Sequence, residues 1–221
     1  MDTQYKAIIF DMDGLLIDSM QYWVDCDQEW FGSFGREVTP ELIKFLSGRT
    51  IRENMEWMKQ EFALEESVEW LMQKRNKMTE SIYTQKTQPM PGVEHLVQSI
   101  STSSIKQAIA SGSSKERIQT IIDRFSWNDY FDFCLSAEEV GDRGKPEPDV
   151  FLKAAKKLGV DPARCVVFED AENGVVAAKR AGMACVAVPD KRWSVGDFSR
   201  ADLIADSLED TRLSDYIHID I

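Results

Sequence analysis

The sequence is poor in the residues that many catalytic and metal sites depend on. It has 2 histidines and 4 cysteines in 221 residues, and the cysteines form neither a CxxC pair nor the spacing of a zinc site. A histidine-based metal site or a Ser-His-Asp triad is therefore poorly supported. The cysteines are expected to be structural thiols of a protein from a reducing compartment; they are Cys26, Cys134, Cys165 and Cys185.

Excess positive charge and long apolar runs are also lacking. Lys and Arg total 26 against 38 Asp and Glu, which gives a net charge of -12. That balance opposes nucleic-acid binding, which needs a basic surface, and docking on anionic membranes. No stretch is typical of a signal peptide, and no run of about 18 apolar residues predicts a membrane span. We expect a cytoplasmic protein without nucleic-acid or membrane partners, and a monomer by default.

What the sequence does contain is an alternation of short apolar runs and amphipathic segments. Strands are predicted at 5–10, 105–110, 133–135, 165–168, 184–188 and 203–204. Most are separated by helical patterns, at 93–100, 115–125, 149–158 and 174–181. This order predicts an α/β fold with a Rossmann-like parallel sheet covered on both faces. Such sheets bind ligands at the carboxyl ends of their strands.

One stretch breaks the alternation. Between 16 and 87 the pattern is helical throughout, with segments at 18–34, 40–45, 50–61 and 66–83. The chain returns through 88–92, QPMPG, whose prolines and glycine suit a linker. We therefore predict two domains: an α/β core of residues 1–15 and 88–221, and an inserted all-helical domain of residues 16–87.

Acidic residues follow the first predicted strand, in the sequence DMDG at 11–14. Unpaired carboxylates at the end of a buried strand cost free energy, so Asp11 and Asp13 have no obvious packing use. They suit a site where a cation lies between them, or where one acid attacks and the other moves a proton. The alternative is a turn that happens to be acidic. Gly14 supplies the backbone freedom for such a turn.

Other strand ends carry polar groups that fit the same edge. Ser111, Gly112 and Ser113 precede a predicted helix, where free backbone N–H groups suit a phosphate, although plain N-capping by Ser113 or Ser114 is the alternative. Lys145 is set between an arginine–glycine pair and prolines, and is either a fixed positive charge or a solvated lysine. Acids follow the fourth strand, where they complete an oxygen-rich Mg²⁺ site or cap the next helix; they are Glu169 and Asp170.

Taken together, these motifs resemble the haloacid dehalogenase superfamily over essentially the whole chain. The most specific segments are IIFDMDGLLIDS at 8–19, KPEPDVF at 145–151 and FEDAENG at 168–174. A helical insertion after the first motif is similar to the small cap of the β-phosphoglucomutase-like branch. The resemblance implies a hydrolase that acts on phosphorylated metabolites.

The resemblance also implies a role for each matching residue. Asp11 would be the nucleophile that forms an aspartyl-phosphate, and Asp13 the general acid and base. Lys145 would steady Asp11 and the phosphate, which would be bound by Ser111, Gly112 and Ser113. Mg²⁺ would be bound by Asp11, the carbonyl of Asp13 and Asp170, with Glu169 close by. An acid at Asp13 points to phosphate-ester chemistry rather than dehalogenation.

The choice between phosphatase and mutase depends on the insertion. The mutase-type histidine and arginine are replaced here by Trp23 and Ile51, and the start DSMQYW at 18–23 is similar to 2-deoxyglucose-6-phosphatase-like enzymes. We therefore expect a Mg²⁺-dependent phosphatase of a small sugar or polyol phosphate. The alternatives are a hexose phosphomutase and a non-catalytic metabolite-binding regulator. Candidate substrate contacts from the insertion are Trp23, Arg49, Arg52, Arg75 and Asn76.

Overall fold

The computed structural model describes residues 5–141 and 143–218. Its centre is a six-stranded parallel sheet in the order β3-β2-β1-β4-β5-β6. The strands are β1 Ala7–Phe10, β2 Lys106–Ser111, β3 Phe133–Ser136, β4 Cys165–Glu169, β5 Ala184–Ala187 and β6 Leu203–Ile204. The predicted α/β class and parallel sheet are confirmed. Because β2 and β4 flank β1 on opposite sides, the strand order reverses at β1, where α/β sheets open a ligand crevice.

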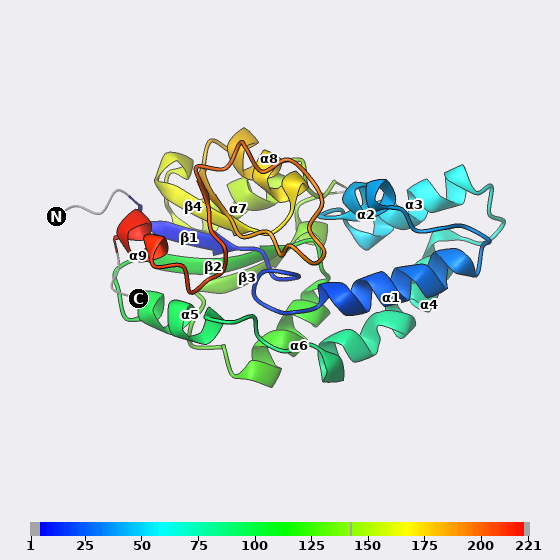
Figure 1. The fold of residues 1–221 in the computed structure, drawn as a ribbon, viewed down its shortest axis with the longest axis horizontal. Helices are drawn as coiled ribbons and strands as arrows, with labels where there is room; N and C mark the ends of the chain where they lie inside the picture. Colours follow the sequence, from blue (N-terminus) through cyan, green and yellow to red (C-terminus); the bar gives the residue numbers. More distant parts are fainter. Residues whose placement is uncertain (1–4, 142, 219–221) are drawn as a thin grey trace.

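Helices cover both faces of the sheet, as Figure 1 shows. Successive β1 residues point to opposite faces, so Ile8 and Phe10 join one buried cluster while Ala7 and Ile9 join the other. The first cluster packs against α5 Val93–Ser101, α6 Lys115–Phe125 and α9 Arg212–Ile217. The second packs against α7 Asp149–Leu158 and α8 Glu172–Arg180. Short 3₁₀ turns occur at η2 Ala137–Glu139 and η3 Pro162–Arg164.

The residues between β1 and α5 form a helical segment beside the carboxyl ends of the strands (Figure 1). Its elements are α1 Met20–Gly32, α2 Pro40–Leu46, α3 Ile51–Glu61, α4 Val68–Ser81 and the π-helix η1 Ile82–Lys86. It has a buried cluster of its own, which includes Trp30, Met58 and Leu71. Capping boxes and N-caps explain where its helices begin: Thr50 accepts from Glu53 N at 3.2 Å, and Ser67 from Trp70 N at 3.1 Å.

Two connections join this helical segment to the sheet, and they run side by side. Asp18 N donates to Gln88 O at 2.8 Å, and Met90 N donates to Leu16 O at 2.9 Å. The predicted boundaries at 15/16 and 87/88 fall at these paired connections. The division into two domains at those residues stays a prediction.

The far end of the helical segment also touches the sheet side of the molecule. Asn173 Nδ2 donates to Ser47 O at 2.8 Å, Lys145 N donates to Gly48 O at 3.0 Å, and Gly144 N donates to the Glu53 carboxylate at 2.8 Å. The loop between α2 and α3 is therefore seated on the loop that precedes α7 and on the first turn of α8.

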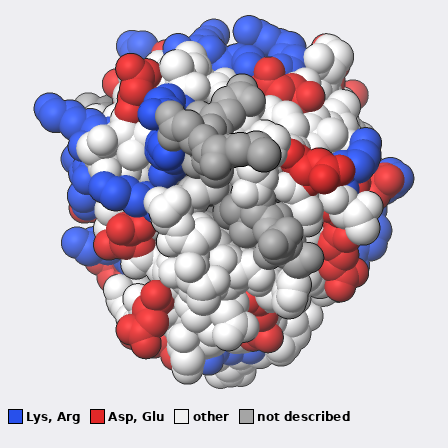
Figure 2. Space-filling view, turned by 90° about the vertical axis from the view of Figure 1, so that its left-hand side faces the viewer, with Lys and Arg blue, Asp and Glu red and all other residues white. Residues whose placement is uncertain are grey.

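The surface carries charges of both signs. Figure 2 shows the face opposite the helical segment, where Lys and Arg gather along one side and Asp and Glu lie among and around them. In the part of the chain that the structure describes, no helix is long and apolar enough to cross a membrane. The cytoplasmic location, the monomeric state and the absence of nucleic-acid partners stay predictions.

Candidate active site

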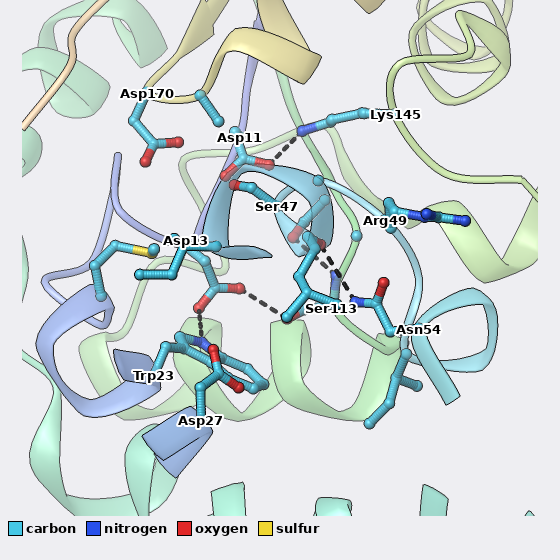
Figure 3. A pocket seen from close by; sticks show the side chains of 18 of the residues that line it. Asp11, Asp13, Trp23, Asp27, Ser47, Arg49, Asn54, Ser113, Lys145 and Asp170 are labelled. Carbon is cyan, nitrogen blue, oxygen red and sulfur yellow. Dashed lines mark hydrogen bonds and ion pairs between the residues drawn. The ribbon is translucent and has the colours of Figure 1, made fainter. Parts of the chain in front are cut away.

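The turn after β1 places two carboxylates at the sheet edge but sends them in different directions. Asp11 N still donates to Phe168 O at 3.0 Å, so Asp11 ends the strand, and Gly14 then turns the chain with a φ of 86°. A Cβ on Gly14 would lie 2.3 Å from Asp170 Oδ2, so close approach as well as positive φ requires glycine. Figure 3 shows Asp11 facing Lys145 and Asp170, whereas the Asp13 carboxylate points away toward Trp23 and Ser113.

A buried lysine ties the ends of β1 and β4 together. Lys145 is 1% exposed, and its Nζ donates to Asp11 Oδ1 and, at 2.5 Å, to Glu169 Oε1. The other Glu169 oxygen accepts from the backbone N–H groups of Asp170 and Ala171 at 3.1 and 3.2 Å. These bonds orient Lys145 toward Asp11 without using the Asp170 carboxylate. Of the two interpretations of Lys145, a solvated surface lysine is therefore excluded by its burial.

The fit to a metal ion can be judged from this donor set. Carboxylate oxygens of Asp11, Glu169 and Asp170 all lie within 4.8 Å of one another. Three carboxylates around one ammonium leave two formal negative charges in a buried place, which a hard divalent cation such as Mg²⁺ would neutralise. The residues therefore fit such an ion. The Asp13 side chain takes no part in this cluster. Its backbone carbonyl stays a predicted ligand.

The ionisation of the cluster reflects its burial. Burial, opposed by the Lys145 ammonium and reinforced by the Glu169 carboxylate, raises the pKa of Asp11 to about 7. Burial and the same neighbouring carboxylates raise the pKa of Asp170 well above its ordinary value. Although burial alone would lower it, the Asp11 and Glu169 carboxylates raise the pKa of Lys145. The amine therefore keeps its proton, while burial favours the protonated forms of Asp11 and Asp170 in the metal-free protein.

Asp13 is surrounded by hydrogen-bond donors from three parts of the chain. Its Oδ1 accepts from Ser19 Oγ at 2.8 Å, from Trp23 Nε1 at 3.3 Å and from the Tyr83 hydroxyl at 3.0 Å. Its Oδ2 accepts from Ser113 Oγ at 2.7 Å. Four donors fix the plane of this carboxylate more closely than packing alone would.

Helix capping and phosphate binding are the two roles predicted for the serine loop after β2, and its serines point in different directions. Ser114 is the N-cap of α6 and accepts from Arg117 N at 3.5 Å, so the capping alternative applies to Ser114. Ser113 turns the other way, to Asp13, and its N–H donates to Ser111 Oγ at 3.1 Å. Ser111, Gly112 and Ser113 all line the same cavity as Asp11. The loop therefore faces the cavity, and phosphate binding by these residues stays a prediction.

A cavity of about 150 Å³ lies between these strand ends and the helical segment. The sheet side contributes the charged groups already described, and the opposite wall is mostly apolar, with Trp30, Phe31 and Met55 among its residues. Set into that wall is an ion pair of Arg75 with Asp27, over which the ring of Trp23 lies 5.2 Å from the guanidinium. Burial, partly offset by Arg75, raises the pKa of Asp27 to about 6.

The predicted substrate contacts from the insertion are only partly brought together. Trp23, Arg49 and Arg75 line the cavity. Arg52 instead lies on the exposed face of α3, near Glu56 and Glu69 at 3.8 and 3.4 Å. Asn76 accepts from Arg117 at 2.9 Å and is not part of the cavity lining. Arg52 therefore faces solvent, and Asn76 joins α4 to α6. For these reasons neither side chain lines the cavity.

Asp27, Arg117 and Tyr83 are among the residues of this site that sequence reasoning missed. Asp27 follows Trp23 by one helical turn, so helical spacing could have found it. Arg117 lines the cavity from α6, and Tyr83 reaches Asp13 from η1. No motif marks these two, because their places depend on how α6 and η1 pack.

Comparisons with known proteins agree with this geometry. A family model described as haloacid dehalogenase-like hydrolase matches residues 8–188. Hexitol phosphatase B of Escherichia coli strain K12 is 32% identical over 215 residues, covering 90% of this chain and 93% of that protein. The phosphorylated carbohydrates phosphatase of Thermotoga maritima is 28% identical over 178 residues, covering 80% and 82% of the two chains.

Among solved structures, the crystal structure of β-phosphoglucomutase from Clostridium difficile superposes with a TM-score of 0.80. It is 24% identical and covers 97% of each chain. The CbbY protein of Rhodobacter sphaeroides in complex with phosphate gives a TM-score of 0.77 at 23% identity, covering 92% of this chain and 95% of that one. These two likenesses show the fold.

Proposed function

Since the chain belongs to the haloacid dehalogenase-like hydrolase family and is a phosphatase, we propose that it hydrolyses the phosphate monoester of a small carbohydrate or polyol. The proposed reaction passes through an aspartyl-phosphate on Asp11 and uses Mg²⁺. The observation that carries this proposal is the separation of the two acids: Asp11 lies against Lys145 in the metal-type cluster, whereas the Asp13 carboxylate points away from that cluster and accepts from Ser113 and Tyr83.

In the first step, an Asp11 carboxylate oxygen attacks phosphorus and the bond from phosphorus to the ester oxygen breaks. The electron pair of that bond goes to the ester oxygen, which takes a proton from Asp13, so that an alcohol leaves. Phosphoryl transfer needs positioning and charge neutralisation above all. Lys145 supplies a fixed positive charge at Asp11. Ser111, Gly112 and Ser113, which line the same cavity, would bind the phosphoryl oxygens.

In the second step, Asp13, now a carboxylate, takes a proton from a water molecule whose oxygen attacks phosphorus. The bond from phosphorus to Asp11 breaks, inorganic phosphate forms, and both acids return to their starting state. Mg²⁺, held by Asp11 and Asp170 with Glu169 close by, would mask the repulsion between carboxylate and phosphate when bound.

The charges of the cavity favour a substrate with one phosphate. Arg75 is already paired with Asp27, and Arg49 lies 4.3 Å over the ring of Phe45. Carboxylates outnumber cations among the cavity-lining residues, so the net negative charge of the lining opposes a second phosphate on the leaving group. This supports a phosphatase over a hexose phosphomutase.

The apolar wall suits the carbon face of a sugar or polyol, and one polar atom in it suits a hydroxyl group. Asn54 lines the cavity, and its buried Oδ1 has no hydrogen-bond partner among the described residues. A buried acceptor without a donor costs free energy, which a substrate hydroxyl would recover. The named activities of the relatives, a hexitol phosphatase and a phosphatase of phosphorylated carbohydrates, support the same substrate class.

A phosphate-release screen over sugar, polyol and nucleotide monophosphates tests the proposal. We expect turnover of sugar or polyol phosphates that requires Mg²⁺ and is lost with EDTA. Asp11→Asn should abolish turnover and acid-stable phosphoprotein alike, because it removes the nucleophile. Asp129→Asn, at an exposed position outside the site, is the matched control. Wild-type turnover by Asp11→Asn would refute the assignment, and isomerisation of a hexose phosphate without phosphate release would favour the mutase.

A further inference from the structure

The hydroxyl of Tyr83 is buried against the proposed acid–base residue. Tyr83 is 1% exposed, and its hydroxyl lies 3.0 Å from Asp13 Oδ1 and 3.0 Å from Ser113 Oγ. Ser113 Oγ lies in turn 2.7 Å from Asp13 Oδ2. The three side chains form a closed triangle of hydrogen-bonding groups. Burial and the Asp13 carboxylate raise the pKa of Tyr83, so the phenol keeps its proton.

Tyr83 is held by the sheet side of the molecule. It lies on the π-helix η1, which is completed by a bond from Thr87 N to Ile82 O at 3.0 Å. Arg124 of α6 donates to the carbonyls of Tyr83 and Gln85 at 3.1 and 2.9 Å. Short π-helical turns are frequent at functional sites, where they redirect a side chain. Here Arg124 fixes the backbone of η1 to α6, and the phenol reaches Ser113 of the serine loop.

The chemistry of the donors around Asp13 is not equivalent. Trp23 Nε1 is a donor only, whereas the hydroxyls of Tyr83 and Ser113 can donate or accept. In the proposed reaction Asp13 is an acid in the first step and a carboxylate in the second. The two hydroxyls can rotate their protons to partner Asp13 in both forms without moving an oxygen atom.

We propose that Tyr83, together with Ser113, is a positioning residue that holds the Asp13 carboxyl group in line with the ester oxygen of the substrate. This inference rests on the proposed function. When the phosphorus–oxygen bond breaks, the leaving oxygen takes the Asp13 proton, and Tyr83 itself neither gains nor loses one. Its contribution is the orientation of the carboxyl group, which decides whether the proton is within reach of the leaving oxygen.

The test compares leaving groups. Tyr83→Phe keeps the ring and removes only the hydroxyl. We measure kcat/KM, which reports the steps up to release of the alcohol, for sorbitol 6-phosphate and for p-nitrophenyl phosphate; if sorbitol 6-phosphate is not turned over, the best alkyl phosphate of the screen replaces it. An alkoxide needs a proton as it leaves, whereas p-nitrophenolate does not. We expect a fall of about 10-fold or more for the alkyl ester, within the range that general acids supply, and less than about 3-fold for the aryl ester.

Tyr22→Phe is the matched control, because the Tyr22 ring packs against the same core from α1 and takes no part in the triangle. Its ratio of the two kcat/KM values should equal that of the wild type. If Tyr83→Phe does not fold, Ser113→Ala removes the other hydroxyl of the triangle. Because Ser113 also faces the phosphate, both esters should be turned over more slowly, but the loss should still be several-fold larger for the alkyl ester.

Equal losses on both esters, or no loss on either, would overturn the positioning role. These outcomes are distinct from failure of the proposed function, which would appear in the wild-type protein as no phosphate release or as full activity of Asp11→Asn. A selective loss for the alkyl ester supports Tyr83 as a partner of the acid.

Discussion

Replacing Lys145 by methionine should destabilise the metal-free protein strongly at alkaline pH and much less at acidic pH. Lys145 is 1% exposed and contacts Asp11 and Glu169, which are 7% and 1% exposed. Methionine fills a similar volume but leaves the carboxylates facing one another without a cation. Removing one partner of a buried ion pair costs more than the pair itself contributes, because the remaining charge has neither water nor partner.

The size of the loss in stability follows from the ionisation of the carboxylates around Lys145. Burial raises the pKa of Asp11 to about 7 even with Lys145 present, against an ordinary value near 3.9 in the unfolded chain. The folded state therefore binds this proton more tightly, so stability falls as the pH rises from about 4 toward 7. Without Lys145 the pKa of Asp11 rises further. We expect a loss of about 3–5 kcal/mol near pH 8.5, and of about 1–2 kcal/mol near pH 5.5, where Asp11 carries a proton.

Urea unfolding in EDTA at the two pH values, followed by circular dichroism, measures both losses. Lys106→Met is the matched control, because the Lys106 ammonium donates to Leu158 O at 2.6 Å, away from the carboxylate cluster. Its effect should hardly depend on pH. A loss that is the same at both pH values, or below about 1 kcal/mol near pH 8.5, would refute the reasoning from the buried charge.

Two further predictions concern charge at the same cavity. Mg²⁺ should raise the thermal midpoint more near pH 8 than near pH 5.5, because the ion must displace protons from acids whose pKa values are raised; equal shifts in differential scanning fluorimetry would contradict this. Arg75→Met leaves Asp27 buried without its cation, and the loss of about 3 kcal/mol should appear above pH 7. Because burial already raises the pKa of Asp27 to about 6, most of that loss should disappear below about pH 5. Urea titrations across this range measure it.

The strands and the sites at their ends were predictable because the signals are local. The apolar runs that predict β1, β2, β3, β4, β5 and β6 agree with the observed strands to within a residue or two. Parallel strands place their carboxyl ends at one edge, so acids that follow β1 and β4 must meet there. That Asp11, Lys145 and Asp170 gather could thus be read from the order of motifs alone.

The walls of the cavity were less predictable. Helical spacing shows which face of a helix is buried. It does not show which distant helix or strand that face packs against. Arg52 and Arg75 are both arginines on amphipathic helices, yet one faces solvent and the other is buried against Asp27. The difference comes from how α3 and α4 pack, which no single segment encodes.

By itself, the sequence determined the α/β architecture, the position of the helical segment after β1 and the residues that carry the proposed chemistry, since these depend on short-range patterns and on strand order. Only the tertiary structure decided that Asp11 and Asp13 face different partners. It turns Asp11 toward Lys145 and the acidic cluster, and it turns Asp13 toward Ser113 and Tyr83. The physical reason is that the hydrogen-bond partners from η1 and from the loop after β2 are 70 and 100 residues away along the chain from Asp13, and they meet it only when both segments pack at the same strand end.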